Sequence, residues 1–119
     1  DYAMGIKQRI GTRIVLHGAS SVPGNQIEHL IDDGVCKVNL WTALERDTTP
    51  VLFRRMVENA SKVAGGETVE RLKDAGLLGS ICPSRGKASL DFFTTVYRQD
   101  IIFNEMKKII SYYLSLWYK

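Results

Sequence analysis

Two short clusters of small and polar residues carry the chemistry that this sequence can offer. The clusters consist of His17, Gly18, Ala19 and Ser20, and of Asn39 and Thr42 within the run NLWT. An imidazole can bind a metal ion. Successive N–H groups of a glycine-containing loop, together with a serine hydroxyl, suit the oxygens of a phosphate group. The first cluster therefore predicts a metal ligand beside an anion-binding loop, and the second offers a further anion site where a helix begins.

Each cluster follows a segment that has the composition of a β-strand. Residues 13–17 (RIVLH) form a short β-branched run without polar alternation, which predicts a strand buried on both faces of a parallel sheet. Residues 35–40 (VCKVNL) predict the next strand. Functional side chains in βα architectures emerge at the carboxyl ends of strands. We therefore expect both clusters to lie at one edge of the sheet.

The segment between the two strands predicts a loop and then a crossover helix. Residues 18–24 (GASSVPG) indicate the loop, and Pro23 fits the first turn of the helix. Apolar residues at helical spacing, Ile27 and Leu30 among them, continue to Gly34, which ends the run. A strand, a helix and a strand in this order predict a parallel pair with a right-handed crossover.

A simpler interpretation of each cluster stays open when that cluster is taken alone. A histidine at a strand end is more often a structural hydrogen-bonding group than a metal ligand, and Asn39 and Thr42 can merely turn the chain and cap a helix. Only the pairing of the two loops favours a common anion over these alternatives.

The rest of the chain predicts mostly helices. We expect a helix before Gly11, another that opens with Thr42 as its N-cap and runs through Leu44 to Glu58, where Pro50 interrupts or restarts it, and a third that starts at Thr68. A loop over residues 76–87 precedes a long final helix capped by Ser89, whose broad apolar stripe is typical of a core or an oligomer interface. Because the chain begins with Asp1 in an apparently helical stretch, we expect residues upstream of it.

The stretch from Arg13 to Arg46 resembles a known family. Its sequence, RIVLHGASSVPGNQIEHLIDDGVCKVNLWTALER, is similar to the region of the last two strands in class II fructose-bisphosphate and tagatose-bisphosphate aldolases. The resemblance lies in the HGAS motif followed in order by Pro23, Gly34, Lys37, Asn39 and Thr42.

The resemblance implies an α/β fold, namely the C-terminal part of a (β/α)8 TIM barrel, with its last two βα units and C-terminal helices. Residues 1–119 would form one partial aldolase domain. Within it, residues 1–46 would be a βαβ region that binds phosphate and metal, and residues 47–119 a helical C-terminal region. Since a barrel closes only with all its strands, we expect the isolated chain to be poorly stable, or to pair with missing segments or with copies of itself.

The resemblance also implies a site. His17 would bind Zn²⁺, which acts as a Lewis acid in the family. The residues that would bind the substrate phosphate are Gly18, Ala19, Ser20, Asn39, Leu40, Trp41 and Thr42. Trp41 departs from the family pattern, which has a small or polar residue there.

The implied reaction is the reversible aldol cleavage of a ketose bisphosphate to dihydroxyacetone phosphate and an aldehyde. The family uses two further histidine ligands and an acidic general acid/base, all from earlier segments, and His29 matches no motif position. We therefore expect this fragment alone to be inactive, and the full-length form to be a homo-oligomer. The alternative is a truncated or degenerate, non-catalytic relative that binds a sugar phosphate or acts as an assembly segment.

Composition argues against other classes of function. Of 119 residues, 45% are hydrophobic and 24% charged, which is ordinary for a globular protein. A net charge of +3 is too small and dispersed to predict nucleic-acid binding. Apolar runs are too short for a membrane helix, and the two cysteines, Cys36 and Cys82, suggest no disulfide framework. We expect a cytoplasmic protein whose partner is a phosphorylated ketose.

Overall fold

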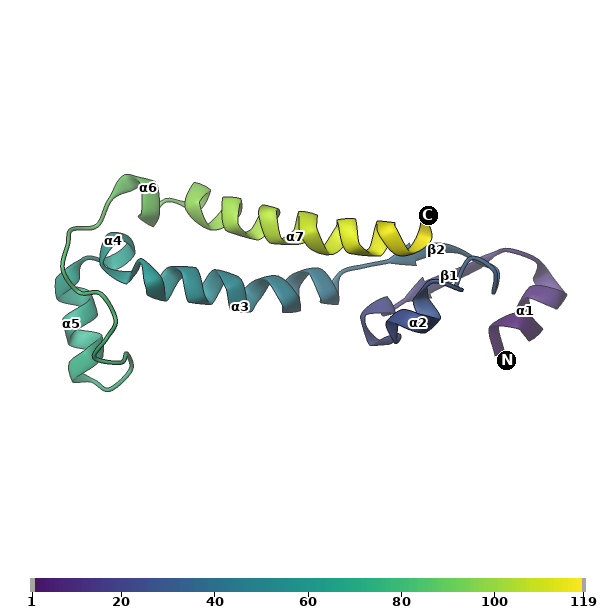
Figure 1. Cartoon of the computed structure of the whole chain (residues 1–119), viewed down its shortest axis with the longest axis horizontal. Helices are drawn as coiled ribbons and strands as arrows, with labels where there is room; N and C mark the ends of the chain where they lie inside the picture. The colour runs from purple at the N-terminus through teal and green to yellow at the C-terminus, as the bar shows by residue number, and fades with distance from the viewer. Residues whose placement is uncertain (1, 119) are drawn as a thin grey trace. The chain divides into compact units, whose positions relative to one another are not determined.

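The computed structural model describes residues 2–118, which form helices and a small parallel sheet (Figure 1). The elements in chain order are α1 (Tyr2–Ile10), β1 (Ile14–His17), the 3-10 turn η1 (Ala19–Ser21), α2 (Gly24–Ile27), β2 (Val35–Asn39), α3 (Thr42–Glu58), α4 (Ala60–Ala64), α5 (Gly66–Asp74), α6 (Leu90–Phe93) and α7 (Thr95–Trp117). They divide into two compact units. We call residues 2–47 with 106–118 the strand unit, and residues 48–105 the helical unit.

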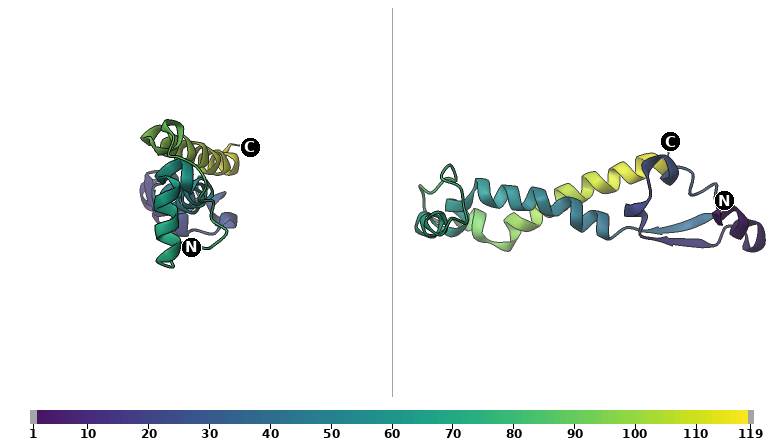
Figure 2. Two further views of the ribbon diagram at one scale, coloured as in Figure 1. Left: turned by 90° about the vertical axis from the view of Figure 1, so that its left-hand side faces the viewer. Right: turned by 90° about the horizontal axis from the view of Figure 1, so that it is seen from below.

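Strands β1 and β2 lie side by side and run parallel, as Figure 1 and the right-hand view of Figure 2 show. The predicted parallel pair is therefore confirmed, and the larger barrel stays a prediction. A register shift separates the pair Ile14–Val35 from the next pair, Val15–Lys37, so that Cys36 has no partner residue on β1. This β-bulge moves the second half of β2 by one residue. Its consequence is that His17 pairs with Asn39.

The core of the strand unit lies between the sheet, the crossover and the end of α7. Its buried residues are Ile27, Leu30, Val35, Ala43 and Tyr113. The indole Nε1 of Trp117 donates a hydrogen bond of 2.9 Å to the carbonyl of Ile27. This contact joins segments 90 residues apart in the sequence.

The prediction that β1 is buried on both faces is wrong. Ile14 and Leu16 pack against the core and are partly buried, whereas Val15 and His17 are exposed. In a strand, alternate side chains point to opposite faces, and only one face of β1 is covered in the described residues. The apolar run therefore did not distinguish a strand covered on one face from one covered on both.

Three predicted helix boundaries differ from the structure near the sheet. Pro23 directly precedes α2 instead of lying in its first turn, and α2 is a single turn followed by turns up to Gly34. Thr42 is the first residue of α3 and not its N-cap. Pro50 lies inside α3 and does not interrupt it. A proline removes one N–H donor, and here the two ends of α3 are anchored by apolar packing of Ala43 and Val57.

Helix α1 agrees with the prediction, since it ends just before Gly11, which has a left-handed φ of 71°. No residue of α1 is buried. Lys7 holds it to the sheet, because its ammonium donates to the carbonyl of Asp32 and its aliphatic stem covers Gly34.

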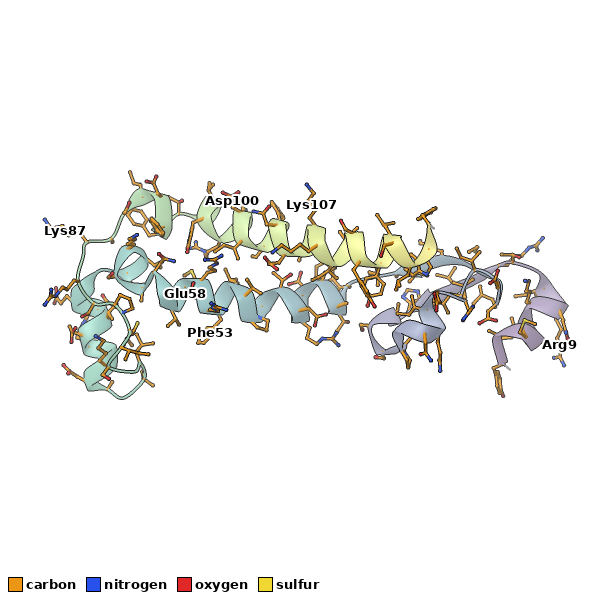
Figure 3. All side chains as sticks on the ribbon, viewed as in Figure 1. Arg9, Phe53, Glu58, Lys87, Asp100 and Lys107 are labelled. Atoms are coloured by element: carbon orange, nitrogen blue, oxygen red, sulfur yellow. The ribbon has the colours of Figure 1, made fainter. Side chains whose placement is uncertain are left out.

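The helical unit has a small core of Ala60, Val69 and Cys82. Nδ2 of Asn59 donates a hydrogen bond of 3.1 Å to Oη of Tyr97, which connects the end of α3 to α7. On α3, Phe53 projects into solvent away from α7 (Figure 3).

One predicted helix start in this unit is wrong, whereas Ser89 does occupy an N-cap position and the loop over residues 76–87 is confirmed as free of helix and strand. Helix α5 begins at Gly66 and not at Thr68, with Glu67 in its first turn. Ser89 precedes only the four-residue α6, and an extended Thr94 separates α6 from α7. The expected long final helix is thus two helices. Nothing in the spacing of apolar residues signals the break at Thr94.

Both cysteines are free thiols, Cys36 exposed and Cys82 buried. Among residues 2–118, no helix combines the length and apolarity needed to cross a membrane.

Candidate functional site

The carboxyl ends of β1 and β2 place a histidine and an asparagine in direct contact. Nδ2 of Asn39 lies 3.1 Å from Nε2 and 3.3 Å from Nδ1 of His17. The contact follows from the register, because opposite residues of neighbouring strands present their side chains on one face. An amide N–H donates only to the ring nitrogen that lacks a proton. His17 is exposed and Asn39 half-buried, so the pair faces the surface of the strand unit.

A left-handed residue turns the chain sharply after β1. Gly18 has φ 73° and ψ 30°, a conformation that costs glycine nothing and that other residues rarely adopt. A Cβ added there would meet no atom within 4 Å, so the requirement for glycine is conformational. The turn leads into η1. There the N–H of Ser21 donates a hydrogen bond of 3.0 Å to the carbonyl of Gly18.

Ala19 and Ser20 contribute differently to this turn. Ala19 is fully buried, so its methyl group helps to fix the loop and only its backbone could reach a ligand. Ser20 is half-buried and adds a hydroxyl. A turn of this kind can present consecutive N–H groups to an anion.

The second cluster connects β2 to the start of α3. The N–H of Glu45 donates to the carbonyl of Trp41 at 3.2 Å, which closes the first turn of α3. The N–H groups at a helix start have no carbonyl one turn earlier to bond, and the helix dipole favours negative charge there. Thr42 adds an exposed hydroxyl at this point, and the indole of Trp41 is 70% exposed.

The two clusters line one hollow of about 270 Å³. Its lining residues are His17, Gly18, Ala19, Ser20, Asn39, Leu40, Trp41 and Thr42. The structure thus brings together all eight residues that the sequence singled out. What sequence reasoning missed is the direct contact of His17 with Asn39, for which the bulge at Cys36 left no sequence signal.

Of the lysines and arginines that the structure describes, none lines the hollow, so an anion there would be held by N–H groups, hydroxyls and the start of α3. The nearest ion pair along the chain joins Arg46 and Asp47, whose Nε and Oδ1 atoms lie 2.6 Å apart. The hydrogen bond from Arg46 lowers the pKa of Asp47 below its ordinary value. This carboxylate therefore remains charged at neutral pH, and it does not line the hollow.

Comparison with known proteins decides the family. The family model of class II fructose-bisphosphate aldolases matches residues 3–80, about two thirds of the chain. The chain belongs to the class II fructose-bisphosphate aldolase family. The match includes β1, β2 and the complete hollow, and it extends beyond the 34-residue stretch that first suggested these aldolases.

A curated class II aldolase relative supports the assignment over a shorter segment. The chain is 41% identical over 54 residues to the D-tagatose-1,6-bisphosphate aldolase subunit GatY of Klebsiella oxytoca. That segment is 45% of this chain and 19% of the relative. The chain therefore spans less than a fifth of the relative's length. No solved structure matches the chain.

The described residues do not by themselves fit the zinc that class II aldolases generally use. A catalytic zinc ion has three protein ligands, and residues 2–118 contain no group of three or more histidine, cysteine or acidic side chains that could hold a metal ion. At the hollow, His17 offers one imidazole, and its closest polar neighbour is an amide. The other histidine, His29, is exposed and lines a different hollow.

Proposed function

We propose that this chain forms the phosphate-binding end of a class II ketose-bisphosphate aldolase. The complete enzyme would reversibly cleave a ketose bisphosphate to dihydroxyacetone phosphate and an aldehyde. The observation that supports this most is the hollow itself, in which the HGAS turn and the start of α3 meet across the contact of His17 with Asn39.

The proposed role of the hollow is to hold one phosphate group and thereby to orient the rest of the substrate. Backbone N–H groups of the turn after Gly18 and of the start of α3 would donate to the phosphate oxygens, with the hydroxyls of Ser20 and Thr42. A substrate fixed at one end loses less freedom at the reacting bond. Because these donors are fixed by the backbone, they need no rearrangement to receive the anion.

In the complete enzyme, His17 would supply one ligand of a zinc ion that polarises the substrate carbonyl. Asn39 would orient a zinc-bound His17 with its amide turned so that Oδ1 accepts from the ring N–H, because Nδ2, which faces the ring here, can donate only to the nitrogen that the metal needs. Partners that orient a ligating histidine commonly change metal affinity by about 10- to 100-fold. Further ligands and the general acid/base would come from parts of the enzyme outside residues 2–118.

A second candidate function is a non-catalytic relative that binds a sugar phosphate or serves as an assembly segment. The observation that favours it is the single imidazole at the hollow, with no cluster of metal ligands among the described residues. Both candidates require phosphate binding or assembly through the strand unit, but only the first requires His17 for catalysis.

A chimera with the GatY subunit tests the first candidate. Residues 13–46 of this chain replace the matching segment of GatY, and zinc-dependent cleavage of tagatose 1,6-bisphosphate is measured. We expect an active chimera, loss of activity in its His17→Ala variant, and undiminished activity in the matched control His29→Ala. Unchanged cleavage after His17→Ala would refute the ligand role. A folded chimera that binds dihydroxyacetone phosphate without cleaving substrate would favour the non-catalytic candidate.

A further inference from the structure

We propose that the indole of Trp41 makes the hollow selective for organic phosphates over inorganic phosphate, by covering the carbon chain attached to the phosphate group. This inference rests on the proposed function, because it takes the hollow as the phosphate site. It adds a specificity-determining side chain, which acts on the part of the ligand that the N–H groups do not reach.

Among residues 2–118, Trp41 is the only aromatic residue that lines the hollow, and its side chain is mostly exposed. Its backbone is held by the hydrogen bond from the N–H of Glu45 in the first turn of α3. The indole nevertheless remains 70% exposed. A tryptophan side chain carries a large apolar surface that is usually covered. Single exposed apolar side chains are common on protein surfaces, and what distinguishes Trp41 is that it lines a hollow together with polar groups, as aromatic residues of ligand sites do.

The lining of the hollow divides into a polar part and an apolar part. His17, Ser20, Asn39 and Thr42 offer polar side chains, which together with the backbone suit phosphate oxygens. Trp41 offers no acceptor and only one donor, its indole N–H. Inorganic phosphate has no apolar surface to place against the indole, whereas a phosphorylated ketose carries C–H groups next to its phosphate. The hollow, at about 270 Å³, has room for more than a phosphate group alone.

The size of the effect follows from the apolar area that the ligand covers. If the ligand covers about 50 Å² of the indole, the affinity should rise about tenfold relative to a ligand that leaves the indole bare. Removal of the side chain should therefore weaken binding of the organic phosphate alone. Replacement by phenylalanine should retain most of the selectivity, since an aromatic face remains.

The experiment measures the affinities of the 119-residue chain for dihydroxyacetone phosphate and for inorganic phosphate by isothermal titration calorimetry. We expect Trp41→Ala to weaken binding of dihydroxyacetone phosphate about tenfold and to change binding of inorganic phosphate by less than about twofold. Trp41→Phe should lie near the wild type. Phe53→Ala is the matched control, because Phe53 is a similarly exposed aromatic residue on α3 that does not line the hollow.

Fluorescence of the remaining tryptophan shows whether Trp41→Ala is folded, since Trp117 packs against Tyr113 in the core of the strand unit. Equal affinities of the wild type for the two ligands would overturn the inference and leave the proposed function standing. So would equal losses for both ligands in a folded Trp41→Ala variant. If the wild type binds neither ligand, the proposed phosphate site fails, and the inference fails with it.

Discussion

The strand unit and the helical unit differ in how far apart in the sequence their contacts reach. In the strand unit, the hydrogen bond from Trp117 to Ile27 spans 90 residues, and Tyr113 packs with residues of the crossover and β2. In the helical unit, the bond from Tyr97 Oη to the carbonyl of Arg55 spans 42 residues. The helical unit buries only Ala60, Val69 and Cys82 as its apolar core.

The residues of the candidate site likewise lie in one of the two units. The hollow belongs wholly to the strand unit, where long-range pairing places two loops together. In the helical unit, the ion pairs of Arg54 and Arg55 with Glu58 lie within one helix turn and are exposed, so they add little stability. The hollow forms where two parallel strands end side by side, with His17 and Asn39 only 22 residues apart, and among residues 2–118 the helical unit contains no strand pair.

The largest expected effect is loss of the strand unit when its central aromatic residue is removed. Tyr113 is 8% exposed, and Tyr113→Ala should lower the free energy of unfolding by about 3–5 kcal/mol. Both tryptophans belong to the strand unit, so urea unfolding followed by tryptophan fluorescence reports on this unit. Tyr112→Ala is the control, because the neighbouring Tyr112 is 54% exposed and should cost less than about 1 kcal/mol. Similar losses for the two variants would contradict the assigned core.

A glycine substitution should disturb the helical unit and leave the other unit intact. A Cβ at Gly66 would lie 2.1 Å from the carbonyl oxygen of Ser84, so Gly66→Ala should cost about 1–3 kcal/mol. Amide hydrogen exchange in α4 and α5 measures this loss, while tryptophan fluorescence should not change. The matched variant Gly5→Ala, in α1 with open space around the new methyl group, should stabilise its helix by about 0.5–1 kcal/mol. A fluorescence transition that shifts with Gly66→Ala would show that the two units do not unfold separately.

A smaller effect of opposite sign is expected at Thr48 in the helical unit. Its side chain is 3% exposed, and within residues 2–118 its Oγ1 has no hydrogen-bond partner. Thr48→Val removes a buried polar atom at nearly constant shape, which should raise the free energy of unfolding by about 1 kcal/mol. Thr49→Val at an exposed position is the control, expected to change stability by less than about 0.5 kcal/mol. Destabilisation by Thr48→Val in chemical unfolding would indicate that the hydroxyl is satisfied.

The smallest effect is a pH dependence confined to the strand unit. Burial raises the pKa of Tyr113 above its ordinary value of 10.0, and the charge of Asp47 adds to the rise. A raised pKa in the folded state means that stability is complete below about pH 10 and is lost as the pH rises through the folded-state pKa. Tyr113→Phe should remove this alkaline loss when unfolding is measured between neutral pH and high pH. If Tyr113→Phe loses as much stability at high pH as the wild type, other groups cause that loss.

The sequence predicted the strand unit better than the helical unit, for a physical reason. The strands, the loop after His17 and the positions of Asn39 and Thr42 follow from the pattern of a βαβ crossover, whereas Leu40 and Trp41 were predicted only from the family resemblance. The errors concern caps and breaks, such as the extended Thr94 between α6 and α7, where the choice depends on tertiary contacts. The exposure of one face of β1 was likewise not predictable, because an apolar run does not specify how many neighbours a strand has.

The extra residue in β2 is not needed for the contact of His17 with Asn39, because a ladder without it would pair the same residues. Cys36 is exposed and pairs with no residue of β1, and its thiol touches only the carbonyl of Ile14, at 3.5 Å. A serine at this position should leave the hollow unaltered. Deletion of the residue would remove the bulge and give a regular ladder, in which Ile14 still lies opposite Val35 and His17 opposite Asn39, so that nuclear magnetic resonance should still find the imidazole beside its neighbour.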